Sequence, residues 1–137
     1  MLCNITLRME KGKKRGVRAV DSGVDKSLLS QPEYMARGKV WMEKDGEVYM
    51  GWGRVELLEG IEKYGSIAAA ARSMGMSYRN AWLEVDEMNR LAPTPLVRKE
   101  TGGIGGGNAR LTEEGQKVIA EYNELTRKFH EFLKRFA

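Results

Sequence analysis

The stretch that decides the fold runs from Gly65 to Thr112 and reads GSIAAAARSMGMSYRNAWLEVDEMNRLAPTPLVRKETGGIGGGNARLT. It holds an alanine-rich helix pattern, a turn at Gly75, a second helix pattern after Ser77 and two strand patterns around a run of glycines. This order predicts a winged helix-turn-helix, in which the second helix can enter the major groove of DNA.

The first helix of the motif is predicted from Ile67 to Met74. Ser66 precedes it, and its hydroxyl can accept a hydrogen bond from an unpaired N–H of the opening turn. Apolar residues then recur at three- and four-residue steps, and the alanines at 68–71 permit close approach by another helix. Gly75 is expected to end this helix because glycine tolerates positive φ.

The second helix begins after Ser77, which is expected to cap it. Its inward face is predicted to consist of Ala81, Trp82, Val85 and Met88. Its first turn presents Tyr78, Arg79 and Asn80 outward. Arginine can pair with guanine and asparagine with adenine, so these three are the predicted base-reading residues. For this motif alone, a two-helix hairpin with solvated polar side chains is the alternative.

A wing is predicted after Pro93 and Pro95, which end the helix. Leu96–Thr101 and Ala109–Leu111 can pair as strands around a connection that contains five glycines. Such a connection cannot add to a core, and its ordering costs entropy, so it indicates close approach to phosphate. The expected DNA contacts outside the base-reading residues are Ser66, Ser77, Arg98, Lys99, Gly103, Gly105, Gly106 and Arg110.

A glycine-rich connection is also found in nucleotide-binding sites, so nucleotide binding is a second interpretation of this segment. The phosphate loop of ATPases needs Lys and then Ser or Thr directly after its last glycine, whereas Asn108, Ala109 and Arg110 follow here. A dinucleotide site needs a strand before the glycines and a helix directly after them, but the strand pattern continues to Leu111. The sequence disfavours both nucleotide sites.

The flanking segments complete the predicted domain. Val40–Glu43 and Glu47–Met50 surround an Asp-Gly pair, which is a strong hairpin signal. A helix is predicted over Arg54–Tyr64, with one buried face that packs behind the two helices of the motif. Thr112 is expected to cap a last helix that runs nearly to Ala137.

Apolar residues in this last helix recur in steps of four and three, the spacing of a coiled-coil seam. We expect its first turns to pack on the domain and its later part to pair with a second subunit. The predicted dimerisation residues are Leu125, Phe129, Phe132 and Phe136. A helix that packs wholly against its own hairpin is the alternative.

Composition fits one small domain. The 137 residues carry a formal charge of +4 and a pI near 9.2, which suits a polyanionic partner without proving one. The single cysteine, Cys3, excludes an internal disulfide and fits a reducing cytoplasm, and no apolar run reaches membrane-spanning length. The basic run Lys11–Arg18 is interpreted as a solvated tail, with a DNA-binding arm as its alternative.

No enzyme site emerges from the sequence. His130 falls on the polar side of the last helix, and Asp86 and Glu87 are expected to be solvated helical acids. An enzyme needs at least two convergent catalytic groups, so we expect no catalytic residue, no metal and no cofactor. The predicted organisation is a basic, partly flexible segment at 1–35, the winged helix-turn-helix at 36–112 and the C-terminal helix at 113–137.

Residues from about Ala36 to Leu125 resemble the N-terminal DNA-binding domain of the ModE-type molybdate-responsive transcriptional regulators, which are related to the LysR-type group. The resemblance rests on VWMEKDGEVYMGWG at 40–53, on GRVELLEGIEKYGSIAAAARSMGMSYRNAWLEVDEMN at 53–89 and on TGGIGGGNARLT at 101–112. It implies that the helix around residues 77–80 docks on an operator. The oxyanion-binding modules of longer family members would follow Ala137, so we expect no direct molybdate binding by this chain.

The sequence therefore predicts an α+β fold: a winged helix-turn-helix with an N-terminal β-hairpin, a glycine-rich wing and a long C-terminal helix. The predicted function is that of a cytoplasmic, homodimeric transcriptional regulator that binds duplex DNA. The alternative is a protein-interaction or assembly module without base readout, because fold does not determine function. RNA binding is disfavoured because no aromatic sheet surface is evident.

Overall fold

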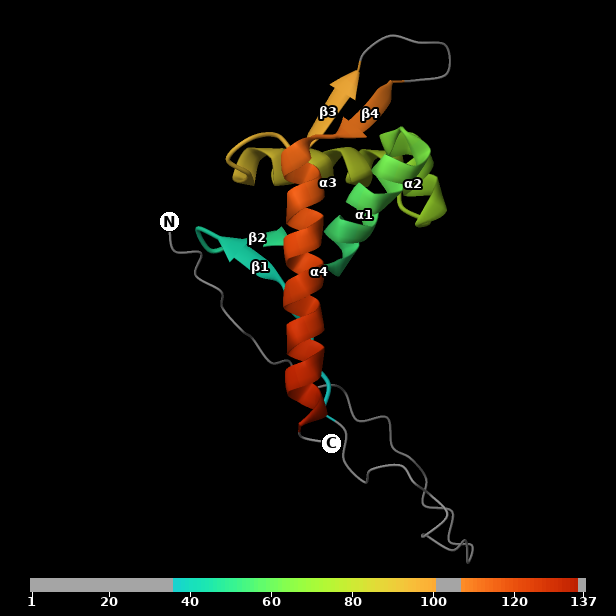
Figure 1. The fold of residues 1–137 in the computed structure, drawn as a ribbon. Helices are drawn as coiled ribbons and strands as arrows, with labels where there is room; N and C mark the ends of the chain where they lie inside the picture. The colour runs from blue at the N-terminus through green and yellow to red at the C-terminus, as the bar shows by residue number, and fades with distance from the viewer. Residues whose placement is uncertain (1–35, 101–106, 136–137) are drawn as a thin grey trace, which may run out of the picture.

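A computed structural model describes residues 36–100 and 107–135. Its elements are β1 (Met42–Lys44), β2 (Glu47–Met50), α1 (Trp52–Tyr64), α2 (Ile67–Ser73), α3 (Tyr78–Leu91), β3 (Val97–Glu100), β4 (Asn108–Leu111) and α4 (Glu113–Lys134). The wing formed by β3 and β4 stands at one end of the molecule, and α4 extends from its base to the opposite end (Figure 1). This is the predicted α+β arrangement. Predictions that lie outside the described residues concern Cys3, Lys11–Arg18, Gly103, Gly105, Gly106 and Phe136.

All three predicted helix caps are present. The hydroxyl of Ser66 accepts from the Ala69 N–H, that of Ser77 from the Asn80 N–H and that of Thr112 from the Gly115 N–H, each at 3.1 Å. Each bond satisfies one donor that an opening helical turn leaves unpaired, a contribution of about 1 kcal/mol. Each capping residue and the N–H that it bonds are only three residues apart, so local sequence determines where α2, α3 and α4 begin.

The core lies where α1 packs against α2 and α3. Leu57, Leu58 and Ile61 of α1 are fully buried. A Cβ placed on Gly60 would come within 3.1 Å of the Ala70 Cβ, so α1 and α2 approach as closely as the alanine run predicts. The remaining fully buried side chains of the core are Met50, Ala70, Ala81, Val85, Met88 and Leu96.

The N-terminal hairpin has the predicted turn but a shifted first strand. Asp45 and Gly46 have φ of 52° and 82°, as a two-residue type I′ turn requires. The prediction that the first strand covers Val40–Glu43 is wrong by two residues, since β1 begins at Met42 and a register shift follows it. The Tyr122 hydroxyl of α4 donates to the Val40 carbonyl at 2.9 Å. This carbonyl, which a longer β1 would use in strand pairing, therefore bonds α4 instead.

The apolar stripe of α4 divides along its length. Val118 and Tyr122 are buried in the domain core, as predicted for the first turns. Phe129 also contacts its own chain, because a Cβ on Gly38 would lie 2.7 Å from the ring. Phe132 is half exposed and Leu125 is partly buried. Phe129 therefore packs partly on its own chain, and the pairing of this part of α4 with a second subunit stays a prediction.

The outer surface of α4 carries ion pairs. Arg127 pairs with Glu124 at 2.7 Å and with Glu131 at 2.6 Å, each about one turn away. Hydrogen bonding from Arg127 is the largest cause that lowers the pKa of the Glu124 carboxyl, to about 2. None of the helices in the two described ranges is long and apolar enough to cross a membrane.

Candidate nucleic-acid interface

The first turn of α3 projects polar side chains into solvent. Tyr78, Arg79 and Asn80 are all exposed, as the sequence predicted, with Tyr78 at 53%. Within residues 36–100 and 107–135, no hydrogen bond or ion pair engages the side chains of Arg79 and Asn80. These donors and acceptors are thus available to an external partner. Their role in base reading stays a prediction.

The outer face of the wing carries an unfavourable pair of charges. β3 and β4 are antiparallel, and Arg98 lies directly opposite Arg110. Both are exposed, and Arg110 has one weak ion pair, with Glu100 at 3.7 Å. Like charges at directly opposed positions destabilise a strand pair. A phosphate group placed against this face would relieve that repulsion.

The inner face of the wing holds Lys99, a predicted DNA contact that already has two partners within its own chain. Its side chain is 22% exposed, pairs with the Asp86 carboxylate and lies with its Nζ 3.6 Å from the centre of the Trp82 ring. Side chains alternate between the two faces of a strand, so Lys99 falls on the opposite face from Arg98. Asp86 is solvated as expected, with 61% of its side chain exposed, and also pairs with Lys99. Trp82 packs against the core as predicted, but it is only partly buried and its ring also contacts Lys99 of the wing.

The remaining predicted contact residues lie at helix starts. Ser66 is partly buried and Ser77 is exposed, and both hydroxyls already accept a capping hydrogen bond. A capping hydroxyl keeps its own O–H free to donate, so both can still reach a phosphate oxygen.

Asn89 anchors the wing to α3 and was missed by sequence reasoning. Its Oδ1 accepts from the backbone N–H groups of Leu96 at 2.8 Å and Val97 at 3.1 Å, and its Nδ2 donates to the Val97 carbonyl at 3.0 Å. The Ala109 N–H also donates to the Gly65 carbonyl at 2.9 Å, which ties β4 to the α1–α2 turn. A helix-disfavoured asparagine near a helix end, ahead of two prolines, was the available signal.

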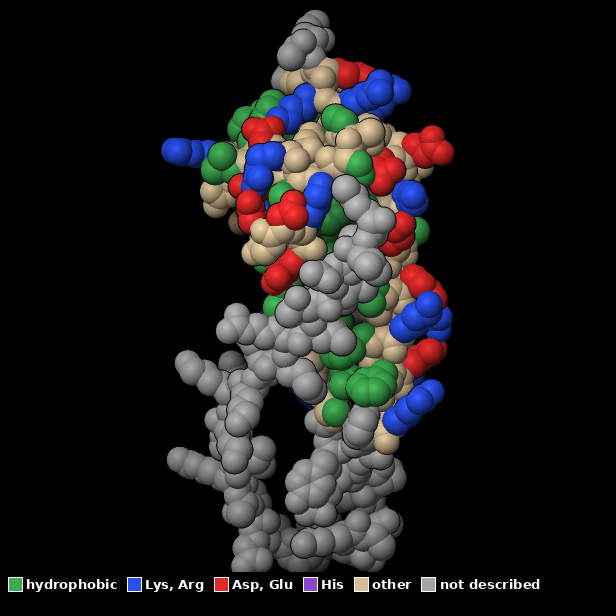
Figure 2. Space-filling model, turned by 90° about the vertical axis from the view of Figure 1, so that its left-hand side faces the viewer, with side chains coloured by type: hydrophobic (Ala, Val, Ile, Leu, Met, Phe, Trp, Pro, Cys, Tyr) green, Lys and Arg blue, Asp and Glu red, His purple; other side chains and the backbone are tan. Residues whose placement is uncertain are grey.

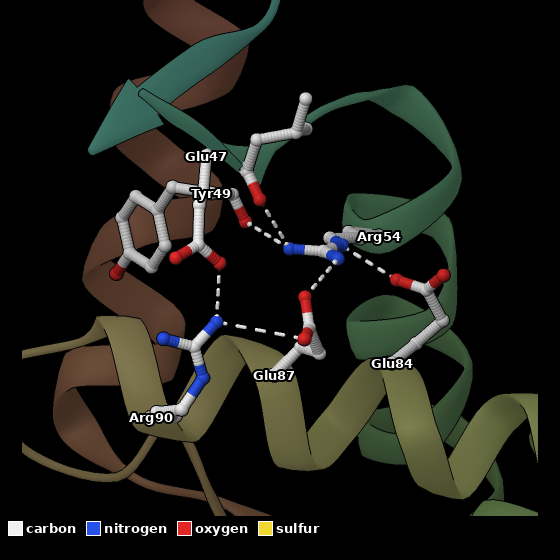
Figure 3. A network of polar contacts seen from close by, with 7 residues as sticks. Glu47, Tyr49, Arg54, Glu84, Glu87 and Arg90 are labelled. Carbon is white, nitrogen blue, oxygen red and sulfur yellow. Dashed lines mark hydrogen bonds and ion pairs between the residues drawn. The ribbon is translucent and has the colours of Figure 1, made fainter. Parts of the chain in front are cut away.

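Arg54 joins three elements beneath the interface (Figure 3). Its Nη1 donates to the carbonyls of Val48 at 2.6 Å and Tyr49 at 3.1 Å, and its Nε pairs with Glu84 at 2.6 Å. Its Nη2 lies 3.4 Å from Glu87. This side chain, only 14% exposed, holds α1, β2 and α3 in one arrangement. The sequence offered no signal for it, because its partners are distant along the chain.

A second arginine extends this network. Arg90 pairs with Glu47 and lies 3.5 Å from Glu87, and the hydrogen bond that Arg90 donates to Glu47 is the largest cause that raises the pKa of Arg90. Glu84, Glu87 and Asp86 of α3 are thus all ion-paired.

Charge at the wing end of the molecule is mixed. Figure 2 shows lysine and arginine side chains interspersed with acidic ones around the upper part of this face. The net charge therefore says less about a partner than the individual unpaired arginines do. Among the residues that the structure describes, no cluster of three His, Cys, Asp or Glu side chains could hold a metal ion.

A family model described as "Bacterial regulatory helix-turn-helix protein, lysR family" matches residues 52–116, which span α1 to the start of α4. This segment is therefore similar to the helix-turn-helix domain of that family. Its boundaries enclose the α3 turn and the wing described above.

Several curated proteins resemble the chain over this domain. The molybdenum-pterin-binding protein MopA of Rhodobacter capsulatus is 45% identical over 84 residues, which cover 61% of this chain and 32% of MopA. The DNA-binding transcriptional dual regulator ModE of Escherichia coli is 46% identical over 72 residues, 53% of this chain and 28% of ModE. The chain thus spans about a third of the length of the relatives it matches.

A crystal structure of a LysR family transcriptional regulator also aligns with the chain. The identity is 17%, the TM-score is 0.46, and the alignment covers 64% of this chain and 28% of the other.

Proposed function

We propose that this chain binds duplex DNA as a sequence-specific transcriptional regulator of the ModE-like type. The observation that carries the proposal is the first turn of α3, where Arg79 and Asn80 are exposed and have no partner within the described residues. In a helix-turn-helix, this turn is the part that meets base edges in the major groove. The relative in Escherichia coli, 46% identical over the aligned region, is named a DNA-binding regulator.

Selection of bound sequences from a random duplex pool tests this function directly. Enrichment of one sequence, with affinity that falls as salt rises, is the expected result. If the alternative of a protein-interaction module holds, no sequence will be enriched and duplex binding will be weak at every salt concentration.

The wing is proposed to hold phosphates through Arg98 and Arg110 without reading bases. Replacing both by alanine should weaken binding to every duplex and lower the salt slope by about two units, one for each phosphate that the variant no longer neutralises. The measurement is affinity against log salt for a specific and a random duplex. Lys134→Ala removes one charge from the far end of α4 and serves as the control. An unchanged slope in the double variant would contradict the role of the wing in phosphate binding.

A homodimer is the further part of the proposal. Leu125, Phe129 and Phe132 recur in steps of four and three on α4, and Phe132 is 50% exposed. Two half-sites on one face of DNA need two linked reading helices. We therefore propose that the dimer buries the apolar side chains of the last turns of α4.

The dimer prediction uses Phe132→Asp, which spares Phe129 and its contact with residue 38. We expect monomers by sedimentation and loss of tight operator binding, because a charge in the seam opposes its burial. Asn123→Asp adds the same charge to an exposed position outside the seam and should leave the oligomeric state unchanged. Dimers of Phe132→Asp would place the interface elsewhere.

The expectations of a cytoplasmic location and of no direct molybdate response stay predictions. Titration of the chain with molybdate, in the presence and absence of operator DNA, checks the second. Saturable micromolar binding that changes operator affinity would contradict it.

A further inference from the structure

A stripe on α3 runs from the base-reading turn to the inner face of the wing. Tyr78, Trp82 and Asp86 are spaced four residues apart, so they lie above one another on one side of the helix. The Tyr78 and Trp82 rings meet edge to face at 5.9 Å and 85°. Lys99 of β3 contacts the other two members, with its Nζ over the Trp82 ring and in an ion pair with Asp86.

Apart from Lys99, the wing stands off from the first turns of α3. A hollow of about 210 Å³ lies between them, lined by Ile67, Tyr78, Trp82, Lys99, Glu100, Gly107 and Asn108. The Trp82 indole N–H is buried and has no hydrogen-bond partner in the described structure. Stacking contacts, rather than a polar anchor, therefore hold this ring. Lys99 lines the hollow, and its Nζ lies over the Trp82 ring on the wing side.

The surroundings of Lys99 argue against direct phosphate contact. A cation that is already paired with a carboxylate and stacked on an aromatic face would have to leave both partners on moving to DNA. Its neighbour Arg98 and the opposed Arg110 are exposed on the other face of the wing, where a phosphate can reach them without such a rearrangement.

Resting on the proposed DNA-binding function, we propose that Lys99 is a positioning residue that clips the wing to α3 through Trp82 and Asp86. The clip sets the angle at which Arg98 and Arg110 meet phosphates while the α3 turn meets base edges. Asn89 secures the base of the wing, and Lys99 secures the strand further out. Specific DNA affinity therefore depends on Asp86, although its negative charge by itself repels DNA.

The direction in which one substitution changes DNA affinity distinguishes a positioning role of Lys99 from phosphate contact. If Lys99 positions the wing, Asp86→Asn should weaken specific binding about three- to fivefold, because the clip loosens. If Lys99 contacts phosphate, the same change should strengthen binding, since it removes a negative charge and frees the lysine. Glu100→Gln removes the same charge from the same strand as Lys99 without touching the clip. Because it also removes the ion-pair partner of Arg110, it should tighten binding slightly.

A double-mutant cycle and a fluorescence measurement complete the test. Lys99→Met combined with Asp86→Asn should bind no more weakly than Lys99→Met alone, because both act on one contact. In a background where Trp41 and Trp52 are phenylalanine, Trp82 is the sole tryptophan, and both single changes should alter its emission without DNA. Lys99→Arg, which keeps the stacked cation, should restore emission and affinity.

The DNA-binding and fluorescence measurements together distinguish failure of this proposal from failure of the proposed function. A wild-type chain that binds no duplex, with emission that still responds to Asp86→Asn, refutes the DNA-binding function and leaves the clip intact as a structural contact. A wild-type chain that binds its operator while Asp86→Asn binds equally well or better overturns the positioning role.

Discussion

Replacing Arg79 or Asn80 by alanine is expected to weaken specific DNA binding by about 1–3 kcal/mol each and to relax the preference for the contacted base. Both side chains are exposed in the first turn of α3 and are not engaged by the described part of the chain, so their removal costs the free protein little. The substitutions therefore destabilise the protein–DNA complex rather than the free protein. Affinity for the selected operator and for single-base variants of it provides the measurement.

Two controls separate base reading from charge. Binding to a random duplex should change less than binding to the operator, because non-specific affinity comes mainly from phosphates. Arg72→Ala removes one exposed positive charge from the last turn of α2 and should not alter base preference. If Arg79→Ala and Asn80→Ala keep wild-type affinity and preference, α3 is not the reading helix.

Gly115→Ala is expected to lower the free energy of unfolding by about 3 kcal/mol, at the upper end of the usual cost of overpacking. A Cβ at this position would overlap the carbonyl oxygen of Leu96 and would lie 3.5 Å from the Leu111 Cβ. That carbonyl cannot move freely, since it accepts from the Thr112 N–H at 2.9 Å. The substitution therefore strains the joint between the wing and α4.

Gly53→Ala is the matched control for this change. Gly53 also lies in a helix, but a Cβ there would meet nothing within 4 Å. Alanine should raise stability by about 0.5–1 kcal/mol, because it restricts the unfolded chain and favours the helix. Denaturant unfolding of both variants gives the two free energies. Equal effects of the same sign would show that helix propensity, not the contact with Leu96, controls position 115.

Local signals in the sequence were sufficient for the elements of the fold. Ser66, Ser77 and Thr112 each bond an N–H three residues ahead, so the residues that decide a helix start are near neighbours in the chain. The turn at Asp45 and Gly46 is equally local. The exposure of Arg79 and Asn80 also followed from helical periodicity, because α3 buries only one face.

The positions of Arg54, Asn89 and Phe129 were decided by tertiary structure. Arg54 bonds Glu84, 30 residues away, and Phe129 packs beside Gly38 on a segment with no regular pattern. No periodicity links such residues, since their contacts exist only after the helices have packed.

Lys99 shows the same limit within the candidate site. Its residue type and place in a basic wing favoured phosphate contact, whereas strand pairing turned it toward α3 and gave it Trp82 and Asp86 as partners. The sequence by itself determined which elements form and which helix turn is exposed. Only the tertiary structure decided which wing cations are free, because that depends on which face of the β3–β4 hairpin packs on α3.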